Sequence, residues 1–306
     1  MVPTGASARS LAFLRSPHLA AAGGMFLWAI TIIIVRWARD FAPPLGLSFW
    51  RAMLGIVLLS LLAGPALKSD WRILRHHLPM VFWLGFLLMV GGNMALFIGL
   101  QHTTAINAGL INAIEPTAIV ALAVLLFRDP VSLRQWIGIA ISFAGVVVLA
   151  IRADIDVLLN FGFNVGDLWV IGAMFSWAMY ANWLRKVPRG LSPYGLVIAM
   201  LAAGCILGLP LYVWESVTVR PMTFDLNTLI AIGLLGVLSS TLGIWLWNYA
   251  VAGLGPGSAG LYINLIPPYT VALAILFLGE SLMTFHVIGI AVIGAGLYLA
   301  IFDRRK

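Results

Sequence analysis

The hydrophobic and polar positions of this chain form long, continuously apolar runs separated by short polar breaks. Ten such runs can be read, and each has about the 20 residues that a helix needs to cross ~30 Å of hydrocarbon. They cover residues 18–37, 44–64, 78–100, 104–127, 133–151, 167–185, 194–214, 227–252, 257–278 and 282–302. Apolar and polar residues do not alternate within a run, which excludes a transmembrane β-barrel. The pattern predicts an all-α integral membrane protein with ten transmembrane helices.

Part of this pattern occurs twice. Residues 108–149 align without a gap with residues 259–300. The second segment repeats these residues of the first: Ala108, Gly109, Leu110, Pro116, Val120, Ala121, Leu122, Ala123, Leu125, Ile137, Gly138, Ile139, Ala140, Ala144 and Gly145. A shared proline in one arm and shared Ile-Gly-Ile-Ala and Ala-Gly motifs in the other exceed what apolar composition alone explains. The pattern indicates an internal duplication.

The duplication extends to the first span of each half, where Met-Phe-Leu-Trp-Ala at 25–29 is matched by Met-Phe-Ser-Trp-Ala at 174–178. Each half then holds five spans, and because five is odd, the second half must enter the membrane inverted. We expect a first repeat over 1–151, a connecting loop over 152–166 and a second, inverted repeat over 167–306. Inverted repeats around a midplane site are typical of secondary transporters.

The positions of Lys and Arg predict the orientation. If both termini are cytoplasmic, the cytoplasmic segments hold Arg9, Arg15, Lys68, Arg72, Arg75, Arg128, Arg134, Arg185, Lys186, Arg189, Arg304, Arg305 and Lys306. The opposite side then holds only Arg36, Arg39, Arg152 and Arg220. This bias follows the positive-inside rule and predicts that both termini are cytoplasmic. The net charge of +7 therefore reflects orientation, and no nucleic-acid partner is expected.

Composition excludes a soluble protein, because 62% of the residues are hydrophobic and only 9% are charged, against about 25% charged in soluble domains. The single cysteine, Cys205, excludes an intramolecular disulfide and a cysteine-based metal cluster. Metalloprotease, serine-hydrolase, P-loop and dinucleotide-binding motifs are absent from the sequence. We expect no enzyme activity, no cofactor and no metal site.

Several motifs resemble a known family. The second half contains Trp247-Asn248-Tyr249-Ala250, Ala259-Gly260-Leu261, Pro267, Leu278-Gly279-Glu280 and Gly289, and the first half contains Glu115-Pro116 and Gly138. With these motifs the chain resembles the ten-span EamA-type exporters of the drug/metabolite transporter superfamily, and among them the bacterial aromatic amino-acid exporters. The first half departs from the family pattern, because Arg128-Asp129 stands where Gly-Glu is usual. The resemblance implies export of small metabolites by alternating access through a central cavity.

Polar residues inside spans are costly unless they face a partner or a wet cavity, so each is a candidate for function. Glu115 is the only acidic residue deep in a predicted span, and Asn112 lies on the same helix face. Pro116 breaks the helix beside them, and Arg51 in the second span is a possible counter-charge. Glu115 is predicted to bind a substrate amino group or a proton, and Arg51 a carboxylate. Alternatively, the two form a structural charge pair, or Arg51 extends to the membrane interface.

The second repeat offers a similar arrangement, with Asn264 one position past the counterpart of Asn112 and Pro267 matching Pro116. Further candidate substrate-binding residues are Asn93, Thr241, Trp245, Asn248 and Tyr262. An asparagine amide can bind the carboxylate or ammonium group of an amino acid, and it can equally join two helices.

Aromatic residues inside spans suggest a binding surface for a flat apolar side chain. Trp28 and Trp177 occupy matched positions of the two repeats, and Tyr180 lies one turn after Trp177. Packing against lipid or within the core is the alternative for each of them.

Taken together, the sequence predicts a secondary transporter of the bacterial inner membrane that exports amphipathic metabolites, specifically aromatic or bulky apolar amino acids. Its expected partners are a small-molecule substrate and membrane lipid, and a monomer is favoured. Two alternatives remain at this point: export of other hydrophobic metabolites or drugs, and a membrane scaffold without transport activity.

Overall fold

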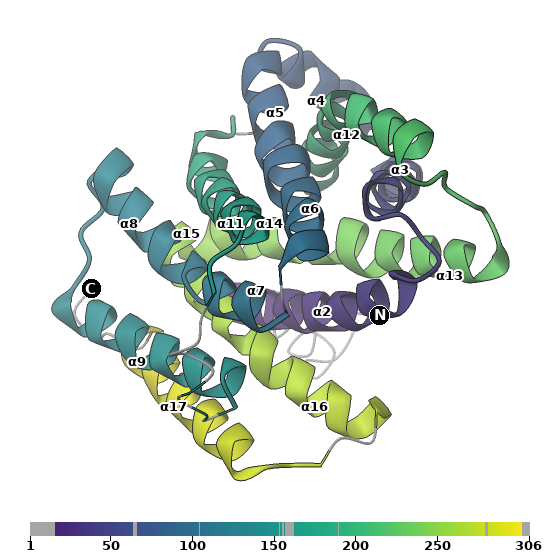
Figure 1. Cartoon of the computed structure of the whole chain (residues 1–306). Coiled ribbons are helices and arrows are strands. Elements are labelled where there is room, and N and C mark those ends of the chain that lie inside the picture. Colours follow the sequence, from purple (N-terminus) through teal and green to yellow (C-terminus); the bar gives the residue numbers. More distant parts are fainter. Residues whose placement is uncertain are drawn as a thin grey trace, which may run out of the picture.

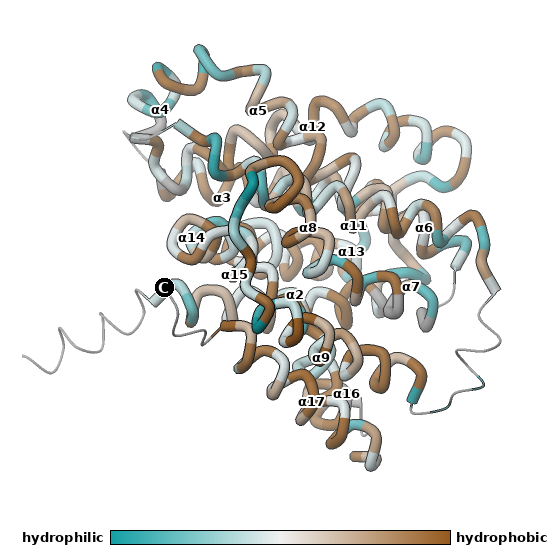
Figure 2. The backbone as a smooth tube through the Cα atoms, turned by 90° about the vertical axis from the view of Figure 1, so that its left-hand side faces the viewer, coloured by the Kyte–Doolittle hydropathy of each residue, from teal (hydrophilic) through white to brown (hydrophobic). Residues whose placement is uncertain are grey.

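Helices are the only regular secondary structure in the described part of the chain. The computed structural model describes residues 16–63, 66–103, 105–152, 154, 156, 162–188, 190–278 and 281–301. These residues form helices and their connections, with no β-strand among them. Hydrophobic residues run along the helices, and hydrophilic ones gather in connections and in the short helix α4 (Ala66–Leu74) (Figure 2). The predicted all-helical architecture is confirmed.

The helices follow the chain in the order drawn in Figure 1. Before residue 152 they are α2 (Pro17–Ala38), α3 (Pro44–Ala63), α4, α5 (Leu78–Gly85), the π-helix η1 (Phe86–Met94), α6 (Ala95–His102), α7 (Ala105–Asn112), α8 (Glu115–Phe127) and α9 (Leu133–Ala150). After it come α11 (Val165–Trp183), the 3₁₀ turn η2 (Leu184–Lys186), α12 (Pro193–Thr218), α13 (Leu226–Leu235), the π-helix η3 (Gly236–Gly243), α14 (Ile244–Leu254), α15 (Pro256–Leu261), the 3₁₀ turn η4 (Tyr262–Leu265), α16 (Ile266–Leu278) and α17 (Thr284–Ile301).

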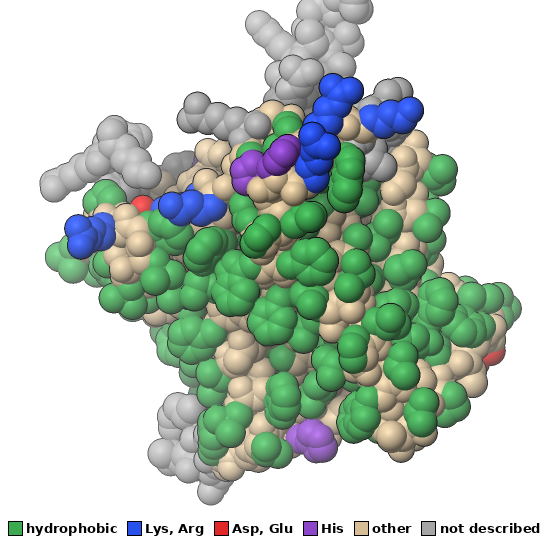
Figure 3. Space-filling view, turned by 90° about the horizontal axis from the view of Figure 1, so that it is seen from above, with side chains coloured by type: hydrophobic (Ala, Val, Ile, Leu, Met, Phe, Trp, Pro, Cys, Tyr) green, Lys and Arg blue, Asp and Glu red, His purple; other side chains and the backbone are tan. Residues whose placement is uncertain are grey.

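Seven helical segments of the described chain are long and apolar enough to cross a membrane. They are Pro17–Val35, Pro44–Leu62, Leu78–His102, Leu133–Ala150, Tyr194–Thr218, Leu226–Leu254 and Thr284–Ile301. The other three predicted spans fall on α7 and α8, on α11, and on α15 to α16. Hydrophobic side chains cover the face shown in Figure 3, and Lys and Arg gather along one edge of it. The chain is a multi-pass membrane protein.

Glu115 is not the only acidic residue inside a helical span. α12 continues four residues beyond its predicted end and includes Glu215, which is 4% exposed. The Glu215 carboxylate accepts hydrogen bonds from the backbone N–H groups of Leu45 (3.0 Å) and Gly46 (2.7 Å) at the start of α3. Because the first N–H groups of a helix lack partners within the helix, this carboxylate is well matched to them.

The duplication is visible in the helix geometry. The third predicted span of each half contains a π-helical segment, η1 in one and η3 in the other. In each, a polar side chain donates to the carbonyl five residues before it: Asn93 to Leu88 (2.6 Å) and Thr241 to Gly236 (2.8 Å). These bonds satisfy carbonyls in the altered hydrogen-bond ladder of a π-helix.

The two halves also meet through glycines on α9 and α17, which lie side by side in Figures 1 and 2. Gly138 of α9 lies against Gly296 of α17, and Gly145 of α9 lies against Gly289. The order of the contacts is reversed along α17, so the two helices are antiparallel. Small residues allow such close backbone approach between membrane helices.

Candidate substrate site

Arg51 is the centre of the candidate site. It lies on α3 inside a membrane span and is only 4% exposed. Its Nη1 donates to Ser239 Oγ of η3 (2.8 Å), and its Nη2 donates to Asn93 Oδ1 of η1. The guanidinium carbon also lies 5.8 Å from the centre of the Phe97 ring. Arg51 therefore connects the two π-helical segments, one from each half.

No carboxylate of the described residues balances the charge of Arg51. Among the described residues, only oxygens of uncharged side chains accept from its guanidinium, and Nε has no acceptor. In this structure Arg51 and Glu115 are not paired, in contrast to the charge pair considered from the sequence. A buried cation without a counter-charge is costly. An anionic group that reached Arg51 would therefore be bound favourably.

Glu115 is the second charged residue among the candidates, and it is also buried, with 6% exposure. It is the first residue of α8, directly after the two-residue break that follows Asn112, and Pro116 is the second. Proline is well tolerated there, because the N–H that it lacks would have no partner within the helix. Within the described part of the chain the Glu115 carboxylate forms no hydrogen bond or ion pair, and Asn112 is half-buried. Glu115 is therefore available to a proton or an ammonium group.

The matched tryptophans contact the π-helical segment of the opposite half. Trp177 of α11 lies against Gly92 of η1, so close that a Cβ added at Gly92 would fall 2.1 Å from the indole nitrogen. Trp28 of α2 lies against Gly243 of η3, with the corresponding distance 2.8 Å. Gly92 and Gly243 are themselves matched by the alignment of the two repeats. The half-buried indoles therefore lie next to the segments that hold Arg51.

A third group of candidates lies on α14. Asn248 Oδ1 accepts a hydrogen bond from the Tyr180 hydroxyl (2.7 Å), which joins α14 to α11. Trp245 stacks on Tyr249 with the ring centres 6.0 Å apart. Trp245 Nε1 and Asn248 Nδ2 are buried donors with no acceptor among the described residues. Since buried donors are normally paired, these two are suited to an incoming acceptor.

The remaining candidates take part in contacts between helices. Tyr262 bonds His18 of α2 (2.6 Å between hydroxyl oxygen and Nδ1), and Asn264 donates to Ser142 of α9 (2.7 Å). Pro267 is the second residue of α16, as Pro116 is of α8. The structure therefore brings together Arg51 with Asn93 and Tyr180 with Asn248, but not Asn264 or Tyr262 with Arg51.

Two cavities lie elsewhere. One of about 310 Å³ is an apolar groove between α8 and α9, lined by Ile114, Thr117, Trp136, Ile139, Ala140 and Phe143. Another of about 160 Å³ lies between Asp129 and the turn at Gly255. No cluster of three or more His, Cys, Asp or Glu suited to a metal occurs in the described residues.

Sequence reasoning missed Ser239, Gly92 and Gly243 as parts of this site. Ser239 carried no signal, because a serine in an apolar span is common. The glycines did carry one, since they are matched between the repeats just as the two tryptophans are.

Comparison with known proteins shows the family of the chain. A model of the EamA-like transporter family matches twice, over residues 15–151 and 164–302. The chain belongs to the EamA-like transporter family. It is a transporter and not an enzyme.

Two relatives have names that mention amino acids. The chain is 28% identical over 293 residues to a probable terminal-alkyne amino-acid exporter of Streptantibioticus cattleyicolor, covering 91% of this chain and 93% of the relative. It is 24% identical over 293 residues to a probable amino-acid metabolite efflux pump of Salmonella typhimurium, covering 91% and 92%. A protein of known crystal structure shares the fold, with a TM-score of 0.75 at 19% identity over 93% of this chain and 96% of that one.

Proposed function

We propose that this transporter exports small amphipathic amino acids, with aromatic or bulky apolar side chains, by alternating access between its two halves. The observation that carries the proposal is Arg51, a buried cation held between η1 and η3 with no carboxylate against it among the described residues. A substrate carboxylate would supply the missing charge and accept from the guanidinium.

The surroundings of Arg51 favour a substrate with an apolar, flat side chain. Trp28 and Trp177 present aromatic surface beside the two π-helices, and Phe97 lies over the guanidinium. Trp245 and Asn248 offer further unpaired donors on α14. The names of the two amino-acid relatives are consistent with this class of substrate.

The proposal includes the architecture predicted from the sequence. Ten spans form two inverted repeats, over 1–151 and 167–306, with both termini cytoplasmic. The α7–α8 pair, α11 and the α15–α16 segment supply the three spans beyond the seven long apolar ones. The two named relatives come from bacteria, and we place the protein in the bacterial inner membrane.

Uptake of labelled phenylalanine, tryptophan and threonine into proteoliposomes, with and without a pH gradient, tests the proposal. We expect saturable uptake with preference for the two aromatic amino acids. Failure to transport any of them, with protein shown to be folded by gel filtration, would contradict it.

The same assay tests whether Glu115 couples transport to a proton gradient. If its carboxylate carries the coupled proton, a pH gradient accelerates uptake by the wild type and not by Glu115→Gln. Uptake that ignores the gradient in both proteins would make the transporter a facilitator.

A further inference from the structure

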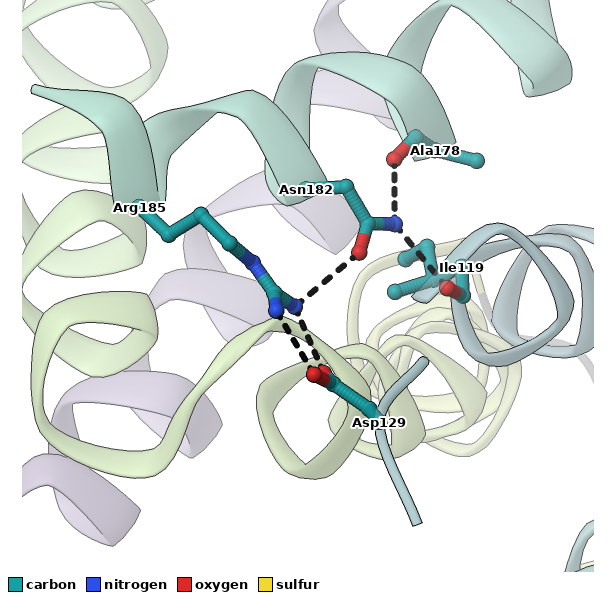
Figure 4. A network of polar contacts seen from close by, with 5 residues as sticks. All are labelled: Ile119, Asp129, Ala178, Asn182 and Arg185. Atoms are coloured by element: carbon teal, nitrogen blue, oxygen red, sulfur yellow. Dashed lines mark hydrogen bonds and ion pairs between the residues drawn. The ribbon is translucent and has the colours of Figure 1, made fainter. Parts of the chain in front are cut away.

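One network of polar contacts joins α8 and the turn after it to α11 and η2 (Figure 4). From the positions of Lys and Arg, this end is predicted to be cytoplasmic. Arg185, in η2 at the end of α11, forms two parallel bonds with Asp129: Nη1 to Oδ1 at 2.9 Å and Nη2 to Oδ2 at 2.8 Å. Asp129 follows α8, so the pair connects an element of the first half to one of the second. Two-pronged pairs of this kind fix geometry as well as adding strength.

The same network continues into the interior. Arg185 Nη2 also bonds Asn182 Oδ1 (3.2 Å), and Asn182 is fully buried. The Asn182 amide nitrogen donates to two carbonyl oxygens, Ile119 on α8 and Ala178 on α11, each at 2.9 Å. α8 and α11 are therefore held together both at their ends and one turn deeper.

The backbone after α8 positions Asp129 for this contact. Arg128 has φ 56° and ψ 33°, a left-handed conformation that ends the helix. The N–H groups of Arg128 and Asp129 then bond back to Val124 (2.9 Å) and Ala123 (3.3 Å). This turn is the usual way to close a helix at its C-terminus.

We infer that Asp129, Asn182 and Arg185 form a clamp that closes this end of the protein and must open in each transport cycle. The inference rests on the proposed function, because alternating access requires the halves to separate at each end in turn. The ion pair is suited to reversible opening, since the side chains of Arg185 and Asp129 are 24% and 37% exposed. Water can replace their bonds when they part, so the pair is weaker than a fully buried one.

Cysteine labelling tests the clamp without any substrate. Cys205 is replaced by Ala, and Ala178→Cys, fully buried beside Asn182, is the reporter. A membrane-impermeant maleimide is added to inside-out vesicles, so that it meets the end predicted to be cytoplasmic. Ala181→Cys, also fully buried on α11, is a second reporter should the first fail to fold.

We expect Asp129→Asn and Arg185→Gln each to raise the labelling rate about fivefold, the population shift that loss of one well-formed ion pair produces. The exchanged variant Asp129→Arg with Arg185→Asp should restore slow labelling. Arg134→Gln, at the same end but outside the clamp, is the control and should label as slowly as the parent.

Labelling that stays at the parent rate in both single variants, or that rises equally in Arg134→Gln, would overturn the clamp. These outcomes are separate from failure of the proposed function, which is absence of amino-acid uptake by the wild type. If the wild type transports phenylalanine, phenylalanine should also change the labelling rate in the parent and not in the single variants.

Discussion

The indole of Trp177 lies directly against the backbone of Gly92, and the equivalent pair, Trp28 and Gly243, makes the same contact with the halves exchanged. Each tryptophan comes from the first predicted span of one half and each glycine from the π-helix of the other. A contact that is reproduced when the halves are exchanged indicates an approximate two-fold relation between them. Any side chain at either glycine would occupy the position of an indole.

Gly92→Ala is therefore expected to displace Trp177. Overpacking of this kind costs about 1–3 kcal/mol, and the moved indole should weaken phenylalanine transport more than threonine transport. Thermal unfolding and uptake in proteoliposomes measure the two effects. Gly172→Ala on α11 is the matched control, because no atom lies within 4 Å of the position of its added Cβ. Equal losses in both variants would show that the Trp177 contact has no special role.

Arg51→Gln should weaken binding of substrates that have a carboxylate. A hydrogen bond to a charged group is worth about 1.5–3 kcal/mol, which corresponds to roughly a 10- to 150-fold loss of affinity. Competition by phenylalanine and by phenethylamine, which lacks the carboxylate, separates the roles. We expect Arg51→Gln to lose inhibition by phenylalanine selectively. An unchanged ratio between the two compounds would make Arg51 a structural residue.

The α9–α17 contact predicts a large difference between two nearby glycines. A Cβ on Gly296 would come within 2.4 Å of the Ser142 backbone nitrogen, whereas at Gly294 it would meet no atom within 4 Å. Gly296→Ala should destabilise the protein by about 2 kcal/mol through overpacking. Gly294→Ala should stabilise it by up to about 1 kcal/mol through better helix propensity. The shift in melting temperature of each variant, measured in detergent, tests this. Shifts of the same sign in both variants would contradict the packing.

Arg128 occupies a backbone conformation that favours glycine, at the position where the family pattern has glycine. Replacing a left-handed residue by glycine removes backbone strain of about 1 kcal/mol. Arg128→Gly should therefore raise the melting temperature by about 1–3 °C. Arg128→Ala relieves no strain and is the control. A gain with alanine as large as with glycine would show that the arginine side chain, and not its backbone, is unfavourable.

The helical architecture could be predicted from the sequence, because continuous apolar runs long enough to cross a membrane are typical of transmembrane helices. The extents of single helices depended on contacts that the sequence does not display. α12 extends to Thr218 and includes Glu215, whose carboxylate accepts hydrogen bonds from α3, a helix distant in sequence.

The candidate site was predicted less well. A polar residue in a span shows that its burial must be compensated, but the sequence does not show which residue it bonds. Asn93 and Arg51 were both singled out, yet their bond depends on the π-helical turn that aims Asn93 at α3. Asn264 is likewise an asparagine inside a predicted span, but its side chain joins two helices by bonding Ser142. Spacing along one helix cannot distinguish these outcomes.

The glycine contacts between α9 and α17 have a consequence for how such a chain can arise. Gly138 and Gly289 are equivalent positions of the repeat, as are Gly145 and Gly296, and each glycine meets the equivalent of the other pair. An interface of this form is what two identical chains make when they associate around a two-fold axis. One chain thus carries a surface that two separate half-length proteins could share. Joining the halves covalently brings these surfaces close together but does not create the fit between them.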